Sequence, residues 1–105
     1  MPSPREIVET KVAANPVVMF SKSYCQYCTK AKALLRELGV QFELIELDQV
    51  DDGDAIQDAL TEITGQRTVP NVFIGGKSVG GNSDIQALYK NDQLVPLLKQ
   101  HGALP

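Results

Sequence analysis

Tryptophan is absent from this 105-residue sequence, and cysteine and histidine are scarce, with two cysteines and one histidine. A structural zinc site usually takes four cysteine or histidine ligands, so this chain cannot complete one by itself. The lone His101 is expected to be a solvated residue near the end of the sequence. No stretch approaches the ~18 apolar residues that a membrane-spanning helix needs, and we expect no membrane partner.

The first residues, MPSPREIVET, also lack the apolar segment of a secretory signal. We therefore expect a cytoplasmic protein, while the removal of a presequence that directs it to another reducing compartment stays open. The length of 105 residues and the hydrophobic fraction of 43% suffice for one packed core. One domain spanning residues 1–105 is expected.

An excess of positive charge is missing as well. The formal net charge is -3, which argues against a nucleic-acid partner held through phosphate contacts. The charges are nevertheless uneven, because residues 10–36 contain five bases and no acid, and residues 42–65 contain eight acids and no base. This pattern is compatible with two solvated faces or with a locally positive field around the cysteines.

Both cysteines, Cys25 and Cys28, lie in the stretch SKSYCQYCTKAKALL. A disulfide stabilises a protein by closing a loop in the unfolded chain, and the effect grows with loop length. A bond between two residues this close would constrain little, so a purely structural disulfide is disfavoured. An isolated Cys-x-x-Cys pair is instead typical of a redox dithiol.

The surroundings of this pair favour a reactive first thiol. The apolar run Val17–Phe20 predicts a buried strand, and apolar residues recur at helical spacing from Cys28 towards Gly39. Cys25 therefore falls at a helix start, where free N–H groups and the helix dipole favour a thiolate, and Lys22 adds a positive charge. Cys28 lies one turn further in, so Cys25 is the predicted nucleophile and Cys28 the resolving thiol.

The remaining pattern predicts an α/β domain with a mixed sheet and helices on both faces. Gly75-Gly76 predicts a hairpin, and Ser83 is the expected N-cap of the helix that follows. The expected elements are a helix over 5–14, a strand over 17–20, a helix after Cys25 that stops at Gly39, a strand over 42–47, a helix through 56–63 that stops at Gly65, strands over 71–74 and 77–79, a helix from about residue 83, and a helix through 94–98 that ends at Gly102.

Two later segments are candidates for contact with the cysteines. GQRTVPN, residues 65–71, places Pro70 at the start of an apolar strand, where it donates no hydrogen bond. GGNSDI, residues 80–85, leads into a helix whose first N–H groups can face an anion. On these residues alone, an ordinary strand entry explains the first segment equally well, and a plain turn is the favoured interpretation of the second.

Three stretches together resemble a dithiol glutaredoxin of the thioredoxin-like superfamily. They are KSYCQYC at residues 22–28, TGQRTVPNVFI at 64–74 and GGNSD at 80–84, in the order and spacing of that family. Thioredoxin itself is a poorer match, because its motif has a tryptophan before the first cysteine and Gly-Pro between the two. The resemblance covers nearly the whole chain and implies a thioredoxin-like α/β fold, with a four-stranded mixed sheet flanked by helices on both faces.

For function, the resemblance implies a glutathione-dependent thiol–disulfide oxidoreductase that reduces protein disulfides and glutathione mixed disulfides. Cys25 would attack the mixed disulfide and keep the glutathione, which a second glutathione or Cys28 would then remove. The implied partners are glutathione, glutathionylated and disulfide-containing proteins and, indirectly, a glutathione reductase, since the chain has no flavin or nicotinamide fingerprint. The resemblance implies a monomer.

The resemblance also implies the residues that would hold glutathione. An extended segment with a cis bond before its proline would pair with the glutathione backbone, and a helix start would take the γ-glutamyl carboxylate. The full set is Lys22, Gln57 and Arg67 for the glycine carboxylate, Tyr27 beside the sulfur, Thr68, Val69 and Pro70 along the backbone, and Gly81, Asn82, Ser83 and Asp84 at the γ-glutamyl end, with Asp84 facing the ammonium.

Two departures from the commonest family pattern bear on a rival function. Gln26 stands where proline usually follows the first cysteine. Family members without that proline include some that hold a [2Fe–2S] cluster between two subunits, through the first cysteine and glutathione; Cys25 would then be a ligand in a cluster-carrying dimer. Because proline has no N–H, Gln26 is also expected to add a donor beside the Cys25 thiolate. Asn82 replaces a further cysteine of many relatives.

Overall fold

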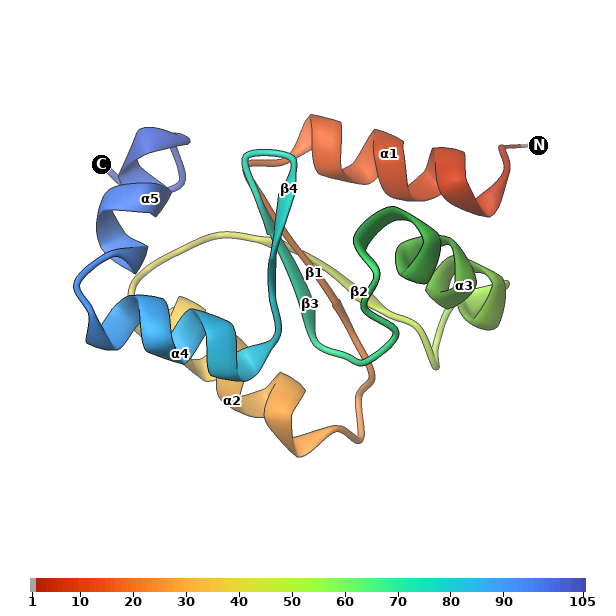
Figure 1. Ribbon diagram of the computed structural model, residues 1–105, viewed down its shortest axis with the longest axis horizontal. Helices are drawn as coiled ribbons and strands as arrows, with labels where there is room; N and C mark the ends of the chain where they lie inside the picture. The colour runs from red at the N-terminus through yellow and green to blue at the C-terminus, as the bar shows by residue number, and fades with distance from the viewer. Residues whose placement is uncertain (1) are drawn as a thin grey trace.

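In the computed structural model, which describes residues 2–105, a four-stranded sheet lies between two groups of helices (Figure 1). The strands are β1 (Val17–Ser21), β2 (Glu43–Glu46), β3 (Asn71–Ile74) and β4 (Lys77–Gly80). They lie in the order β2-β1-β3-β4, with β2 parallel to β1 and the other two pairs antiparallel. The predicted mixed sheet is confirmed.

Five helices complete the described chain: α1 (Pro4–Ala14), α2 (Gln26–Glu37), α3 (Gly53–Thr64), α4 (Asn82–Lys90) and α5 (Leu94–Gln100). Figure 1 shows α1 and α3 on one side of the sheet and α2 and α4 on the other, with α5 next to α4. Each predicted element is present, with ends that differ by a few residues. Within residues 2–105, none of the helices has the length and apolar character needed to cross a bilayer.

One predicted cap is wrong. Gly81, rather than Ser83, is the N-cap of α4, and the helix begins at Asn82. The reason is the carboxylate of Asp84, which accepts a hydrogen bond from the Gly81 N–H at 2.8 Å and so closes the first turn from the opposite direction. The preceding Gly80 has φ +109°, and a Cβ there would collide with the Asp84 carboxylate, so glycine is required.

The core is divided by the sheet into two apolar layers. Alternate residues of a strand point to opposite faces, and Val17 and Met19 pack in the layer that contains α2, α4 and α5. Val18 and Phe20 pack in the layer of α1 and α3, where the Phe20 ring meets Phe73 edge-on at a centroid distance of 5.7 Å. All four residues of β1 named here are fully buried, which holds the strand leading to Cys25 rigid from both sides.

The topology gathers the three motif stretches at one edge of the sheet. The chain leaves β1 and β4 at this edge and enters β3 there, because β3 runs antiparallel to both of its neighbours. The connection from Ser21 to Gln26, the segment that ends at Pro70 and the start of α4 therefore meet, although they are far apart in sequence. The candidate site lies at this edge.

Candidate redox site

Cys25 is the N-cap of α2. It has extended backbone angles, and its Sγ accepts a hydrogen bond from the Cys28 N–H at 3.3 Å. A sulfur in this position takes the place of the serine or aspartate oxygen that commonly caps a helix, and it satisfies a donor that the helix leaves free. Cys25 is partly exposed and Cys28 is buried, and both are free thiols. The predicted placement of the two cysteines is confirmed.

The two thiols have opposite acidities. Partial burial raises the pKa of Cys25, but hydrogen bonds from the Cys28 thiol and from the N–H groups of Cys28 and Tyr27, together with the charge of Lys32, bring that pKa below its ordinary value. Burial raises the pKa of the Cys28 thiol, and its hydrogen bond to Cys25 raises it further. The geometry therefore favours a thiolate at Cys25 and a protonated thiol at Cys28.

The sources of this asymmetry differ from those expected from the sequence. The N–H donors to the sulfur come from Tyr27 and Cys28, the second and third residues of α2, because a cap side chain reaches back to those positions rather than to Gln26, the first. The charge that acts on Cys25 is that of Lys32, whereas Lys22 acts on Asp48.

The uneven charges of the sequence meet across the β1–β2 pair. Lys11 on α1 pairs with Glu43 at 3.1 Å, and Lys32 on α2 pairs with Glu46 at 2.9 Å. The basic segment and the acidic segment contain neighbouring parallel strands, so their side chains are brought together. The acidic segment thus partly balances the positive charge of the basic one, while the Lys32 ammonium still lowers the pKa of Cys25.

The loop before Cys25 is anchored to the segment after β2. The Ser23 N–H donates to Asp48 Oδ1 at 2.9 Å, and the Ser23 hydroxyl donates to Asp48 Oδ2. These two hydrogen bonds lower the pKa of the exposed Asp48 carboxyl. Because the Cys25 N–H also donates to the Lys22 carbonyl at 3.1 Å, the backbone that presents the sulfur is fixed at both ends.

A cavity of about 520 Å³ opens beside the thiol. The sulfur of Cys25 lies 3.8 Å from the carbonyl oxygen of Val69, one of the residues that border the cavity. The Val69–Pro70 peptide bond is cis, as the resemblance implied. Nine residues line the cavity, and they come from α2, from the segment before β3 and from the start of α4: Tyr27, Gln66, Thr68, Val69, Pro70, Gly81, Asn82, Ser83 and Asp84.

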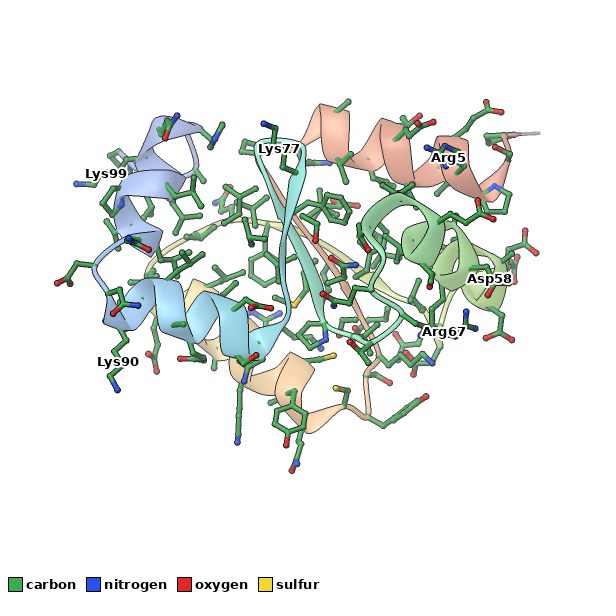
Figure 2. The ribbon with its side chains drawn as sticks, in the orientation of Figure 1. Arg5, Asp58, Arg67, Lys77, Lys90 and Lys99 are labelled. Atoms are coloured by element: carbon green, nitrogen blue, oxygen red, sulfur yellow. The ribbon has the colours of Figure 1, made fainter. Side chains whose placement is uncertain are left out.

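Eight of the residues predicted to bind glutathione are among these nine, and Lys22, Gln57 and Arg67 are not. Gln57 on α3 is buried, and its Nε2 donates to the Arg67 carbonyl at 2.8 Å. The Arg67 guanidinium forms an ion pair with Asp58 at 2.7 Å, and Figure 2 shows the two side chains next to each other. Gln57 therefore supports the backbone of the 65–71 segment.

Gln66 belongs to the stretch at 64–74, but the resemblance implies no role for it. Its side-chain Nε2 donates to the carbonyls of Thr68 at 2.9 Å and Pro70 at 3.0 Å, and it borders the cavity. These bonds hold in place the extended segment on which a ligand's backbone would lie. The local signal is a glutamine two residues before Thr-Val-Pro, which by itself does not distinguish a solvated side chain from a bracing one.

This chain is similar to known proteins in both sequence and structure. The glutaredoxin family model matches residues 17–79. A glutaredoxin of Vernicia fordii is 54% identical over 93 residues, which cover 89% of this chain and 89% of the relative, and glutaredoxin-C2 of Arabidopsis thaliana is 53% identical over 93 residues, which cover 89% and 84%. The crystal structure of a buckwheat glutaredoxin–glutathione complex superposes with a TM-score of 0.95 at 49% identity, covering 97% of this chain and 93% of that one.

Proposed function

Since this chain belongs to the glutaredoxin family of glutathione-dependent oxidoreductases, we propose that it reduces glutathione mixed disulfides and protein disulfides through Cys25 and Cys28. The observation that carries this proposal is the sulfur of Cys25, which caps α2 and lies against the cavity that contains the cis-proline segment. A partly exposed thiolate beside a cavity of about 520 Å³ matches a tripeptide thiol as cosubstrate.

In the proposed cycle, the Cys25 thiolate attacks the glutathione sulfur of a mixed disulfide. A new S–S bond forms between Cys25 and glutathione, the old bond breaks, and its electron pair leaves with the substrate thiolate, which takes a proton from solvent. The thiolate of a second glutathione then attacks the bound glutathione, releasing glutathione disulfide and the Cys25 thiolate. The low pKa of Cys25 favours both its attack and its later departure.

For a protein disulfide, Cys28 takes part. Cys25 first forms a mixed disulfide with the substrate and releases one substrate thiol. Cys28 then loses its proton and attacks Cys25 Sγ, which releases the second substrate thiol and leaves a Cys25–Cys28 disulfide for two molecules of glutathione to reduce. The burial of Cys28 one turn behind Cys25 fits a thiol that reacts only within the chain.

Glutathione is proposed to lie along Thr68–Pro70, with its γ-glutamyl group at the start of α4. The first N–H groups of that helix face the proposed α-carboxylate, because a helix N-terminus favours anions, and the exposed Asp84 carboxylate faces the ammonium. Lys22 and Arg67 are proposed to meet the glycine carboxylate beyond the cavity lining, where Arg67 would exchange Asp58 for the ligand.

A coupled assay tests this function directly. With NADPH, glutathione reductase and a small glutathione mixed disulfide, we expect NADPH consumption at least about 100-fold above the uncatalysed rate, as enzymatic acceleration requires. Replacing glutathione and its reductase by thioredoxin reductase should reduce the rate to background. Equal turnover with thioredoxin reductase would contradict the proposed dependence on glutathione.

A second candidate function is the binding of a [2Fe–2S] cluster, and the observation that favours it is Gln26 in place of proline, exposed at the start of α2. Within residues 2–105, no group of three His, Cys, Asp or Glu side chains is arranged to hold a metal. Since such a cluster takes four ligands and Cys25 is the more accessible cysteine, two chains and two glutathione thiolates would be needed. The residues therefore fit a shared cluster, not one held by a single chain.

Replacing Gln26 by proline is expected to suppress incorporation of that cluster while leaving oxidoreductase activity within about tenfold of the original. Proline fixes φ near ~-65° and stiffens the first turn, but it removes none of the N–H donors that reach Cys25. Both proteins would be reconstituted anaerobically with iron, sulfide and glutathione, and their visible absorbance and dimer fraction compared. Equal loading in the two proteins, or none in either, would show that this residue does not control cluster binding.

A further inference from the structure

Directly behind the dithiol lies an ion pair that the proposed reaction has not yet used. Lys32 Nζ and Glu46 Oε2 are 2.9 Å apart, and the two side chains are only 11% and 16% exposed. The second carboxylate oxygen, Glu46 Oε1, is buried and has no hydrogen-bond partner among the described residues. Apolar residues of similar volume are commonly as stabilising as such a pair, or more so, so stability alone does not account for it.

The fold places this pair next to both cysteines. Lys32 follows Cys28 by four residues in α2, so the two side chains share one helix face. Glu46 lies opposite Ser21 in the parallel β1–β2 register, and the side chain of the fully buried Ser21 acts to lower the pKa of the Cys28 thiol. Lys32 and Glu46 therefore form a mostly buried ion pair behind the Cys25–Cys28 pair.

The charges around the dithiol come from several elements, and they act on different groups. α2 contributes Lys32, and β2 contributes Glu46. Lys22, directly after β1, interacts with the exposed Asp48. Besides the hydrogen bonds at its own cap, Cys25 is influenced by the Lys32 ammonium, which is thus the cation positioned to act on the reactive sulfur.

We propose that the Lys32–Glu46 ion pair is a positioning element of the redox site, in which Glu46 holds the Lys32 ammonium behind the dithiol and that ammonium favours the reduced, anionic Cys25 over the uncharged disulfide. This inference rests on the proposed function, in which the two cysteines cycle between dithiol and disulfide. Reduction of the disulfide takes two electrons and one proton and yields a Cys25 thiolate and a Cys28 thiol. The disulfide has no charge and the reduced pair has one negative charge, so a fixed cation nearby makes the disulfide the stronger oxidant.

The test is the equilibrium between the two forms at pH 7 in anaerobic buffers of reduced and oxidised glutathione. After acid quenching and alkylation, mass spectrometry separates the Cys25–Cys28 disulfide from the dithiol and from glutathionylated protein. For Lys32→Met we expect the ratio of disulfide to dithiol to rise about tenfold in a given buffer, which corresponds to about 30 mV for a two-electron couple. For Glu46→Gln we expect the opposite shift, because the ammonium loses the carboxylate that partly neutralises it.

Three further variants separate charge from packing. Lys32→Arg should restore the original ratio, and the double variant Lys32→Met/Glu46→Gln should fall between the two single variants. Lys11→Met is the matched control, because it breaks a 3.1 Å ion pair to the same strand, with Glu43, and it should leave the ratio unchanged. Should Lys32→Met not fold, the comparison of Lys32→Arg with Glu46→Gln still decides the question.

Two results would overturn this inference and leave the proposed function intact. One is a disulfide-to-dithiol ratio in Lys32→Met equal to that of the unmodified protein. The other is a change of this ratio in the same direction in Lys32→Met and Glu46→Gln, which lost packing would produce. If Lys32→Met does not fold, a disulfide-to-dithiol ratio in Glu46→Gln equal to that of the unmodified protein would also overturn the inference. The absence of any Cys25–Cys28 disulfide in the unmodified protein would instead overturn the proposed dithiol cycle together with this inference. The equilibrium needs no protein substrate, so it separates these failures.

Discussion

Replacing Cys25 by serine is expected to abolish the glutathione-dependent reduction of a small mixed disulfide, with a loss of at least about 1000-fold, or about 4 kcal/mol of transition-state stabilisation. A serine hydroxyl stays protonated at the helix start that holds Cys25 as a thiolate, and it cannot form the mixed disulfide. The measurement is the initial rate of NADPH consumption with glutathione reductase in excess. Activity in Cys25→Ser near that of the unmodified protein would refute the assignment of the nucleophile.

Cys28→Ser is the matched control, since it removes the other thiol of the same motif. This variant should retain much of the activity on the small mixed disulfide, because a second glutathione can resolve the Cys25 adduct without Cys28. A serine hydroxyl at this buried site still has the Ser21 hydroxyl and the Lys22 backbone within reach, so the fold should persist. A protein disulfide that needs both thiols should lose its reduction in both variants, and a Cys28→Ser protein that still reduces it would contradict the dithiol route.

Reversing the charge of Asp84 is expected to raise KM for the glutathione mixed disulfide by about 100-fold, or about 2.7 kcal/mol, with a smaller effect on kcat. Asp84→Lys puts a cation where the γ-glutamyl ammonium is proposed to bind. It also removes the carboxylate that accepts the Gly81 N–H at 2.8 Å. Steady-state kinetics with varied mixed disulfide would give the two constants separately.

Two companion variants identify the cause of that effect. Asp84→Asn retains an oxygen that can accept the Gly81 N–H but loses the charge, so we expect an intermediate rise in KM, of about tenfold. Glu37→Lys makes the same change of charge at the exposed end of α2 and should leave KM unchanged. If Asp84→Lys and Glu37→Lys had equal effects, overall charge and not the proposed contact would be responsible.

The fold was predictable from the sequence because its signals are local. The run Val17–Phe20 and the helical spacing after Cys28 indicate a strand that leads into a helix, and the structure has β1 and α2 there. The acidity of Cys25 follows from the same local feature, since its sulfur accepts from the N–H groups of Tyr27 and Cys28 in the first turn of the helix. The motif stretches, read as a family resemblance, added the cis bond before Pro70 and the segments that line the cavity.

Only the tertiary structure decided which polar side chains act on that site, because those choices depend on neighbours that are distant in sequence. Lys32 and Glu46 are 14 residues apart and meet only because β2 pairs in parallel with β1. Arg67 faces Asp58, and Gln57 braces the Arg67 backbone, because α3 packs beside the 65–71 segment. Sequence alone thus determined where the reactive sulfur lies and how it is activated locally. The ion pair behind the sulfur and the contacts that brace the cavity depend instead on hydrogen bonds and burial. Those arise only when the sheet is assembled.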